Sequence, residues 1–237
     1  MTFELLTTLV MLTGLEIILG IDNIIFIAIV VQNIEKKYRD KARVLGIALA
    51  LVMRLILLAG IGWIISLTTP LFNVFSNEIS AKDLLLVFGG LFLIVQSTRH
   101  IHDEMNPEEG HAETAKKPTT MKAAIVQILF VDMVFSMDSL LTAIGLTEVL
   151  WVIATAIVVS IGVMLWLSKP IIGIIERHPS LKILALSFVM LVGVLMAAEA
   201  FDHHIPRGYI YFAMAFSTLV ELVNIKVRKT AGLTKSS

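Results

Sequence analysis

The sequence predicts an all-α polytopic membrane protein with seven transmembrane helices. Hydrophobic residues make up 57% of its 237 residues and charged residues only 16%, whereas a soluble domain carries about 25% charged residues. The apolar residues gather in stretches near the roughly 20 residues that a membrane-spanning helix needs. Two of these stretches carry the same acidic pattern. We therefore expect two inverted three-helix repeats followed by a seventh helix.

The predicted spans are apolar stretches separated by short polar segments. They lie near 5–31, 44–67, 83–98, 123–147, 149–168, 183–201 and 208–225. The first stretch lacks a basic start and a small-residue cleavage site, so we expect a mature helix rather than a signal peptide. The chain is interpreted as one transmembrane domain, 1–237. It divides into repeat one at 1–98, a cytoplasmic loop at 99–122, repeat two at 123–201, and the seventh helix and tail at 202–237.

The basic residues predict how the chain is oriented. Sixteen of the nineteen Lys and Arg residues fall in alternate loops and in the C-terminal tail. The opposite side has only Lys82 and Arg207, and Arg54 lies within a span. Since cytoplasmic loops carry the excess of Lys and Arg, the N-terminus is expected outside and the C-terminus in the cytoplasm.

The acidic pattern consists of two carboxylates six residues apart, followed by an amide or a hydroxyl. Residues 15–29 read LEIILGIDNIIFIAI, and residues 131–145 read VDMVFSMDSLLTAIG. At a constant offset of 116 positions, Glu16, Asp22 and Asn23 correspond to Asp132, Asp138 and Ser139. Each ionisable group at a helix centre costs about 2.5–3.5 kcal/mol on insertion scales. Four such groups in matched places predict a polar site near the midplane, built from two antiparallel helices.

The spacing also constrains the geometry of that site. In a straight helix the two carboxylates of one motif lie roughly 120° apart around the axis and about 9 Å apart along it. One ion could then not reach both, so we expect helix interruptions near Gly20–Asp22 and Ser136–Asp138 that would free backbone carbonyls. In a milder version the helices stay continuous and each motif supplies one acid. In a straight helix, the first acid of each motif faces the same way as its amide or hydroxyl, seven residues later.

The ligand types predict the class of cargo. Carboxylate, amide and hydroxyl oxygens suit hard cations such as magnesium, calcium and manganese. The chain has no cysteine to offer a softer metal. The predicted metal ligands are Glu16, Asp22, Asn23, Asp132, Asp138 and Ser139, with the two aspartates Asp22 and Asp138 as primary ligands. The metal is expected as a substrate, and no prosthetic group is expected.

At the level of motifs, the chain resembles the TerC family of integral membrane proteins, closest to its YgdQ-like branch. The resemblance rests on LEIILGIDNIIF, GGLFL, DMVFSMDS, ERHPS at 176–180 and PRGYIYFAM at 206–214. It implies a bacterial inner-membrane transporter fold and divalent-metal handling, with manganese export as the activity. Some relatives are linked to tellurite resistance or to membrane-protein assembly. Similar proteins often have Lys and Glu where this chain has Gln96 and His100.

Several alternatives remain at this point. The buried acids could be structural and bonded to neighbouring helices or to Arg54, which we interpret as a counter-ion or clamp. An intramembrane aspartyl protease would leave two acids surplus, and no GxGD segment is present. No Walker motif is present either, so ATP-driven transport is not expected. We expect a protein that is not an enzyme. A non-transporting assembly or metal-homeostasis partner is the main rival.

The remaining polar groups receive weaker predictions. Glu199 and Glu221 are expected to reach the interface, and the histidine-rich loop at 99–122 is interpreted as a solvated segment. Expected partners are membrane lipid, the divalent ion, and a second copy or another membrane protein. The net charge of zero gives no reason to expect nucleic acid.

Overall fold

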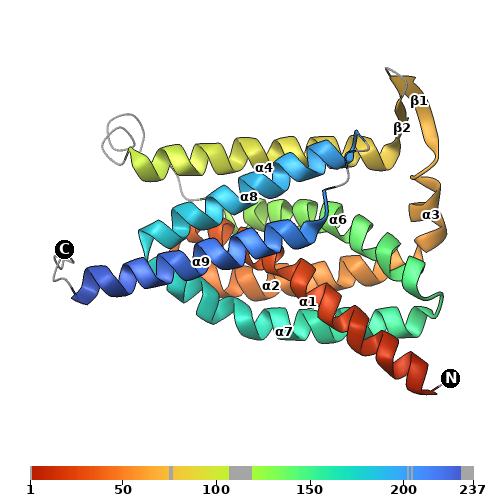
Figure 1. Ribbon diagram of the computed structural model, residues 1–237, viewed down its shortest axis with the longest axis horizontal. Coiled ribbons are helices and arrows are strands. Elements are labelled where there is room, and N and C mark those ends of the chain that lie inside the picture. Colours follow the sequence, from red (N-terminus) through yellow and green to blue (C-terminus); the bar gives the residue numbers. More distant parts are fainter. Residues whose placement is uncertain (1, 75–76, 107–118, 202, 204, 231–237) are drawn as a thin grey trace.

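The computed structural model describes residues 2–74, 77–106, 119–201, 203 and 205–230. Its helices are α1 (Thr2–Gln32), α2 (Lys36–Ala59), α3 (Ile61–Ser66), α4 (Ala81–Met105), α6 (Met121–Leu146), α7 (Leu150–Arg177), α8 (Pro179–Glu199) and α9 (Arg207–Thr230) (Figure 1). All of these described helices except α3 are long and apolar enough to cross a membrane. The seven-helix fold class is thereby confirmed.

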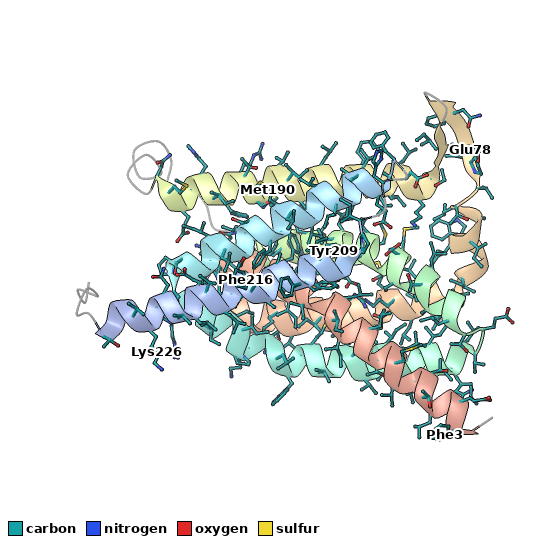
Figure 2. The ribbon with its side chains drawn as sticks, in the orientation of Figure 1. Phe3, Glu78, Met190, Tyr209, Phe216 and Lys226 are labelled. Carbon is teal, nitrogen blue, oxygen red and sulfur yellow. The ribbon has the colours of Figure 1, made fainter. Side chains whose placement is uncertain are left out.

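The long helices run in alternating directions, so α1 begins at one end of the bundle and α9 ends at the other (Figure 1). The closest neighbours are α4 with α8, α1 with α7 and α2 with α6. If α1, α2 and α4 are matched in order with α6, α7 and α8, the α1–α7 pair corresponds to the α2–α6 pair, and the α4–α8 pair corresponds to itself. This is the pattern expected of two related halves. By contrast, α9 packs mainly against α8 and exposes the aromatic side chains of Tyr209 and Phe216 (Figure 2).

Small residues permit the closest helix contacts, as is usual in membranes. A Cβ built on Gly90 in α4 would lie 2.5 Å from the Gly193 carbonyl oxygen in α8, and a Cβ on Gly193 would lie 2.7 Å from the Gly90 oxygen. Likewise, a Cβ on Gly20 in α1 would lie 2.5 Å from the sulfur of Met164 in α7. At Gly90 and Gly193 two helix backbones therefore approach each other closely, whereas at Gly20 the side chain of Met164 packs against the helix.

The predicted interruptions of the two motif-bearing helices are wrong. Both α1 and α6 are continuous through their acidic motifs. Gly20 gives Met164 room to pack against α1, so its lack of a side chain serves helix packing rather than unwinding. In a continuous helix the backbone N–H and C=O groups within the apolar core are hydrogen-bonded to one another. An interruption would leave some of these groups in need of other partners.

Two other elements differ from the predicted boundaries. The short third span belongs to a 25-residue helix, α4, which continues into polar sequence as far as Met105. The second predicted span divides at Gly60 into α2 and α3. A hairpin of β1 (Pro70–Val74) and β2 (Asn77–Ser80) follows, and it was not predicted. Ser80 and Asp83 then form a capping box that starts α4.

Candidate functional site

The centre of the candidate site is a buried arginine between two carboxylates, one from each acidic motif. Arg54 of α2 donates through Nη1 to Glu16 Oε2 at 2.8 Å and through Nη2 to Asp132 Oδ1 at 2.7 Å. Its Nε atom also lies 3.2 and 3.3 Å from the two Asp132 oxygens. None of the three residues is more than 5% exposed. The fork geometry of a guanidinium lets one side chain serve both acids.

The amide and hydroxyl of the motifs cross over to the opposite motif's acid. Asn23 of α1 donates through Nδ2 to Asp132 Oδ1 of α6 at 3.2 Å. The Ser139 hydroxyl of α6 lies beside Glu16 of α1, and it donates to the Ser136 carbonyl at 3.3 Å. This pairing follows from antiparallel helices, because the later residue of each motif meets the earlier residue of the other. The prediction that each acid shares a helix face with its amide or hydroxyl is confirmed.

The cluster has a net negative charge and two oxygen atoms that could contact a positively charged ligand. Two carboxylates against one guanidinium give it a formal charge of −1. The buried oxygens Glu16 Oε1 and Asn23 Oδ1 have no hydrogen-bond partner among the described residues. A buried acceptor without a donor is costly, and a cation or a water molecule is the natural complement to both oxygens.

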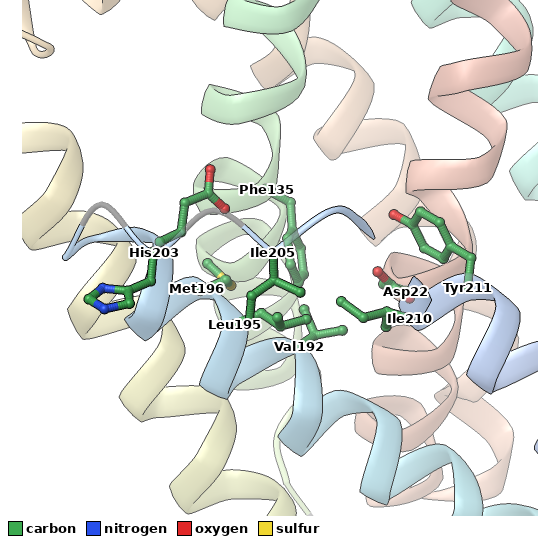
Figure 3. Close-up of a pocket in the computed structure, with 10 residues that line it drawn as sticks. Asp22, Phe135, Val192, Leu195, Met196, His203, Ile205, Ile210 and Tyr211 are labelled. Atoms are coloured by element: carbon green, nitrogen blue, oxygen red, sulfur yellow. The ribbon is translucent and has the colours of Figure 1, made fainter. Parts of the chain in front are cut away.

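Asp22 faces away from this cluster and towards α8 and α9. It lines a cavity of about 30 Å³, room for roughly one water molecule. Asp22 and Tyr211 lie at one end of this cavity, and His203 lies at the other (Figure 3). Glu199 also lines it, whereas its neighbours Asp202 and His204 fall outside the described residues. The cavity therefore joins the second acid of motif one to polar groups between α8 and α9.

Asp138 occupies a different cavity, of about 500 Å³, lined largely by α1 residues. Its Oδ1 atom lies 3.4 Å from Lys82 Nζ at the start of α4. Tyr211 of α9 lines this cavity as well as the one at Asp22. The second acids thus lie in separate cavities whose linings share one tyrosine.

The continuous helices explain this separation of the predicted ligands. In each helix the two acids of the motif are displaced along and around the axis, as the six-residue step requires. The described residues contain no group of three or more Asp, Glu or His side chains placed to hold one metal ion. The acids that meet are Glu16 and Asp132, rather than the predicted primary pair Asp22 and Asp138. The metal-ligand role of the six residues remains a prediction.

Other polar residues lie away from the cluster. Gln96 Nε2 lies 2.9 Å from His100 Nε2. Glu221 accepts a hydrogen bond from Asn224 near the end of α9. Half of the loop predicted at 99–122, residues 107–118 with His111 among them, lies outside the described residues. The counter-ion role of Arg54 was among the sequence interpretations, and its contacts with Glu16 and Asp132 confirm it.

Comparisons with known proteins identify relatives over nearly the whole chain. Residues 1–235 match the family described as "Integral membrane protein TerC family". A "UPF0053 protein" from Haemophilus influenzae is 48% identical over 222 residues, which cover 94% of each chain. "UPF0053 inner membrane protein YgdQ" of Escherichia coli K12 is 50% identical over 90% of each chain. "UPF0053 inner membrane protein YoaE" of the same organism is 41% identical over 93% of this chain and 43% of its own length.

No solved structure matches the chain, so the assignment rests on the family match and on these relatives. Both the extent of the match and the identity over most of each chain point to the same family. The chain therefore belongs to the TerC family of integral membrane proteins.

Proposed function

We propose that this protein transports divalent cations across the bacterial inner membrane and that manganese export is its activity. The observation that carries the proposal is the meeting of Glu16 and Asp132 at Arg54 in the membrane-buried core. The two acids occupy matched places in the two motifs, and oxygen ligands of this kind suit manganese, magnesium and calcium. Manganese is chosen on the family resemblance, since the ligand chemistry alone does not select it.

The two halves of the bundle are proposed to be inverted repeats. In this view α1, α2 and α4 correspond to α6, α7 and α8, and α9 is an addition. The reciprocal helix pairs and the crossed contact between Asn23 and Asp132 support this relation. Sites at the interface of two such repeats, reached alternately from either side, are a common plan in secondary transporters.

Arg54 is proposed to hold the carboxylates while no cargo is bound. A divalent cation and a guanidinium would repel each other at this distance in a low-dielectric interior. Binding of the cation therefore requires Arg54 to release at least one of its two acids. The acceptor oxygens of Glu16 and Asn23 that have no partner among the described residues would then receive the ion.

The second acids are proposed to serve the path to this centre. Asp22 lies in the cavity bounded by α8 and α9, and Asp138 lies in the larger cavity beside Lys82. Each can exchange a cation or a proton with the central pair without sharing its coordination. Protons are the proposed coupling ion, because a carboxylate that loses its cation needs another positive charge in a medium of low dielectric constant.

Flux measurements in sealed vesicles test the proposed function. Purified protein is reconstituted, and uptake of manganese, magnesium and calcium is followed with and without a pH gradient. Protein-dependent manganese flux that changes with the gradient is expected. Equal metal flux in protein-free and protein-containing vesicles, with correctly folded protein, would contradict transport and favour a non-transporting assembly partner.

A further inference from the structure

A third cavity, of about 460 Å³, lies where α1 ends, α2 begins and α7 approaches its end. Figure 1 shows these helix ends together at the end of the bundle that also holds the C-terminal end of α9. The cavity has a cationic rim and an apolar base. Its lining comprises Lys36, Arg39, Arg43 and Lys169, the acids Asp40 and Glu176, and the apolar residues Val31, Ile172 and Gly173.

Each carboxylate of this cavity is already matched to an arginine. Arg43 donates through Nη2 to Asp40 at 2.7 Å, and Arg39 donates through Nη1 to Glu176 at 2.8 Å. The remaining donors fix both guanidinium groups in place. Arg43 also reaches the Ser168 hydroxyl at 2.6 Å and the Leu165 carbonyl, while Arg39 reaches the carbonyls of Gln32 and Ile34. The rim is therefore rigid at its two arginines.

The two lysines give the cavity its surplus positive charge. Neither Lys36 nor Lys169 forms an ion pair with any residue that the structure describes, and both are exposed. With the acids matched by arginines, the lining carries a formal charge of +2. Gly173 leaves open space on the α7 wall, because a Cβ there would have no neighbour within 4 Å. An anionic group of moderate size fits these conditions.

The cavity lies at the ends of two apolar stretches, where phospholipid headgroups are expected. Arg43 directly precedes the apolar stretch 44–67, and Lys169 directly follows the stretch 149–168. One turn into that stretch, Trp166 is 76% exposed, and tryptophan gathers at the membrane interface. Basic pockets between transmembrane helices at this depth bind anionic lipid headgroups. Val31 and Ile172 add apolar atoms to the lining of the cavity.

We propose that this cavity binds the phosphate headgroup of an anionic phospholipid, with Lys36 and Lys169 as the contacting cations. The acyl chains would then run along the lipid-facing side of α7, past the exposed Trp166. This binding site is separate from the carboxylate cluster and does not depend on the proposed transport activity.

Native mass spectrometry of the purified full chain tests this proposal. The protein is titrated with phosphatidylglycerol, with zwitterionic phosphatidylcholine and with inorganic phosphate. Wild-type protein should retain phosphatidylglycerol in preference to phosphatidylcholine. The double variant Lys36→Gln/Lys169→Gln should lose about 10- to 30-fold in phosphatidylglycerol affinity, since each basic residue near an anionic surface contributes about 1 kcal/mol.

Two further double variants make the test specific. Lys122→Gln/Lys226→Gln removes the same charge from exposed positions at the same end of the bundle but outside the cavity, and it should bind like wild type. Lys36→Arg/Lys169→Arg keeps both positive charges and should bind phosphatidylglycerol like wild type. Its binding would show that substitution at these two positions does not itself disrupt folding. Unchanged affinity in the first variant, or an equal loss in the Lys122/Lys226 control, would overturn the site. Displacement of the lipid by millimolar inorganic phosphate would overturn the lipid as its ligand.

Discussion

Glu16 and Asp132 are 116 residues apart in the chain, yet they bind the same guanidinium, that of Arg54, at 2.8 and 2.7 Å. Their helices, α1 and α6, run antiparallel (Figure 1), and the two motifs meet where Asn23 donates to Asp132. All three groups are almost completely buried. The central charges of this membrane protein are thus arranged as one cation between two anions, with a residual formal charge of −1.

Removing the arginine should destabilise the protein strongly. Arg54→Gln leaves Glu16 and Asp132 facing each other without a counter-ion, and loss of one partner from a buried ion pair costs about 3–5 kcal/mol. Thermal unfolding in detergent should show a clearly lowered midpoint. The triple variant Arg54→Gln/Glu16→Gln/Asp132→Asn has no uncompensated charge and should recover most of the loss. An Arg54→Gln midpoint equal to that of wild type would show that the ion pairs contribute little.

The sequence was sufficient to predict the membrane fold and the residues of the central cluster. Apolar stretches report membrane spans directly, because lipid excludes unpaired polar groups. The seven-residue step correctly placed Glu16 with Asn23, and Asp132 with Ser139, on shared faces. The sequence did not reveal which acids would meet, because that depends on the relative height and rotation of α1 and α6. The sequence suggested Arg54 as a counter-ion, but that it binds Glu16 and Asp132 in particular depends on the same helix arrangement.

Close packing between α4 and α8 should be sensitive to a single methyl group. A Cβ at Gly90 or Gly193 would press on the facing backbone carbonyl at 2.5 or 2.7 Å. Gly90→Ala should therefore lower stability by about 1–3 kcal/mol, the usual cost of overpacking. Gly162→Ala in α7 is the matched control, because its Cβ would meet no neighbour within 4 Å. Equal midpoints for the two variants would argue against the close α4–α8 contact.

Gly20 illustrates why glycine in a membrane helix is ambiguous in sequence. A glycine beside an acid is compatible with an unwound turn, and it is equally compatible with close packing against another helix. Here the second explanation holds, since Met164 of α7 occupies the space beside Gly20. The hairpin at 70–80 was missed for a different reason: its strands are short and border on an apolar span.

The orientation of the chain can be tested on its cysteine-free background. Glu35 and Glu148 are exposed in turns at opposite ends of the bundle, between α1 and α2 and between α6 and α7. With the N-terminus outside, Glu148→Cys should react with a membrane-impermeant thiol reagent in intact cells. Glu35→Cys should react only after the membrane is permeabilised. The reverse labelling pattern would invert the topology and place the basic end outside.

Manganese flux in proteoliposomes shows whether the Glu16–Asp132 pair carries the transported cation. Glu16→Gln and Asp132→Asn are measured singly, since either variant leaves Arg54 with one acid and should remain folded. Glu104→Gln is the control, because it removes an acid that is paired with Lys182 rather than with Arg54. Both site variants should lose about tenfold or more in flux, because loss of a charged ligand exceeds about 1.4 kcal/mol, while the control keeps the wild-type rate. Wild-type flux from folded Glu16→Gln and Asp132→Asn proteins would exclude this pair as the ligands of the transported cation.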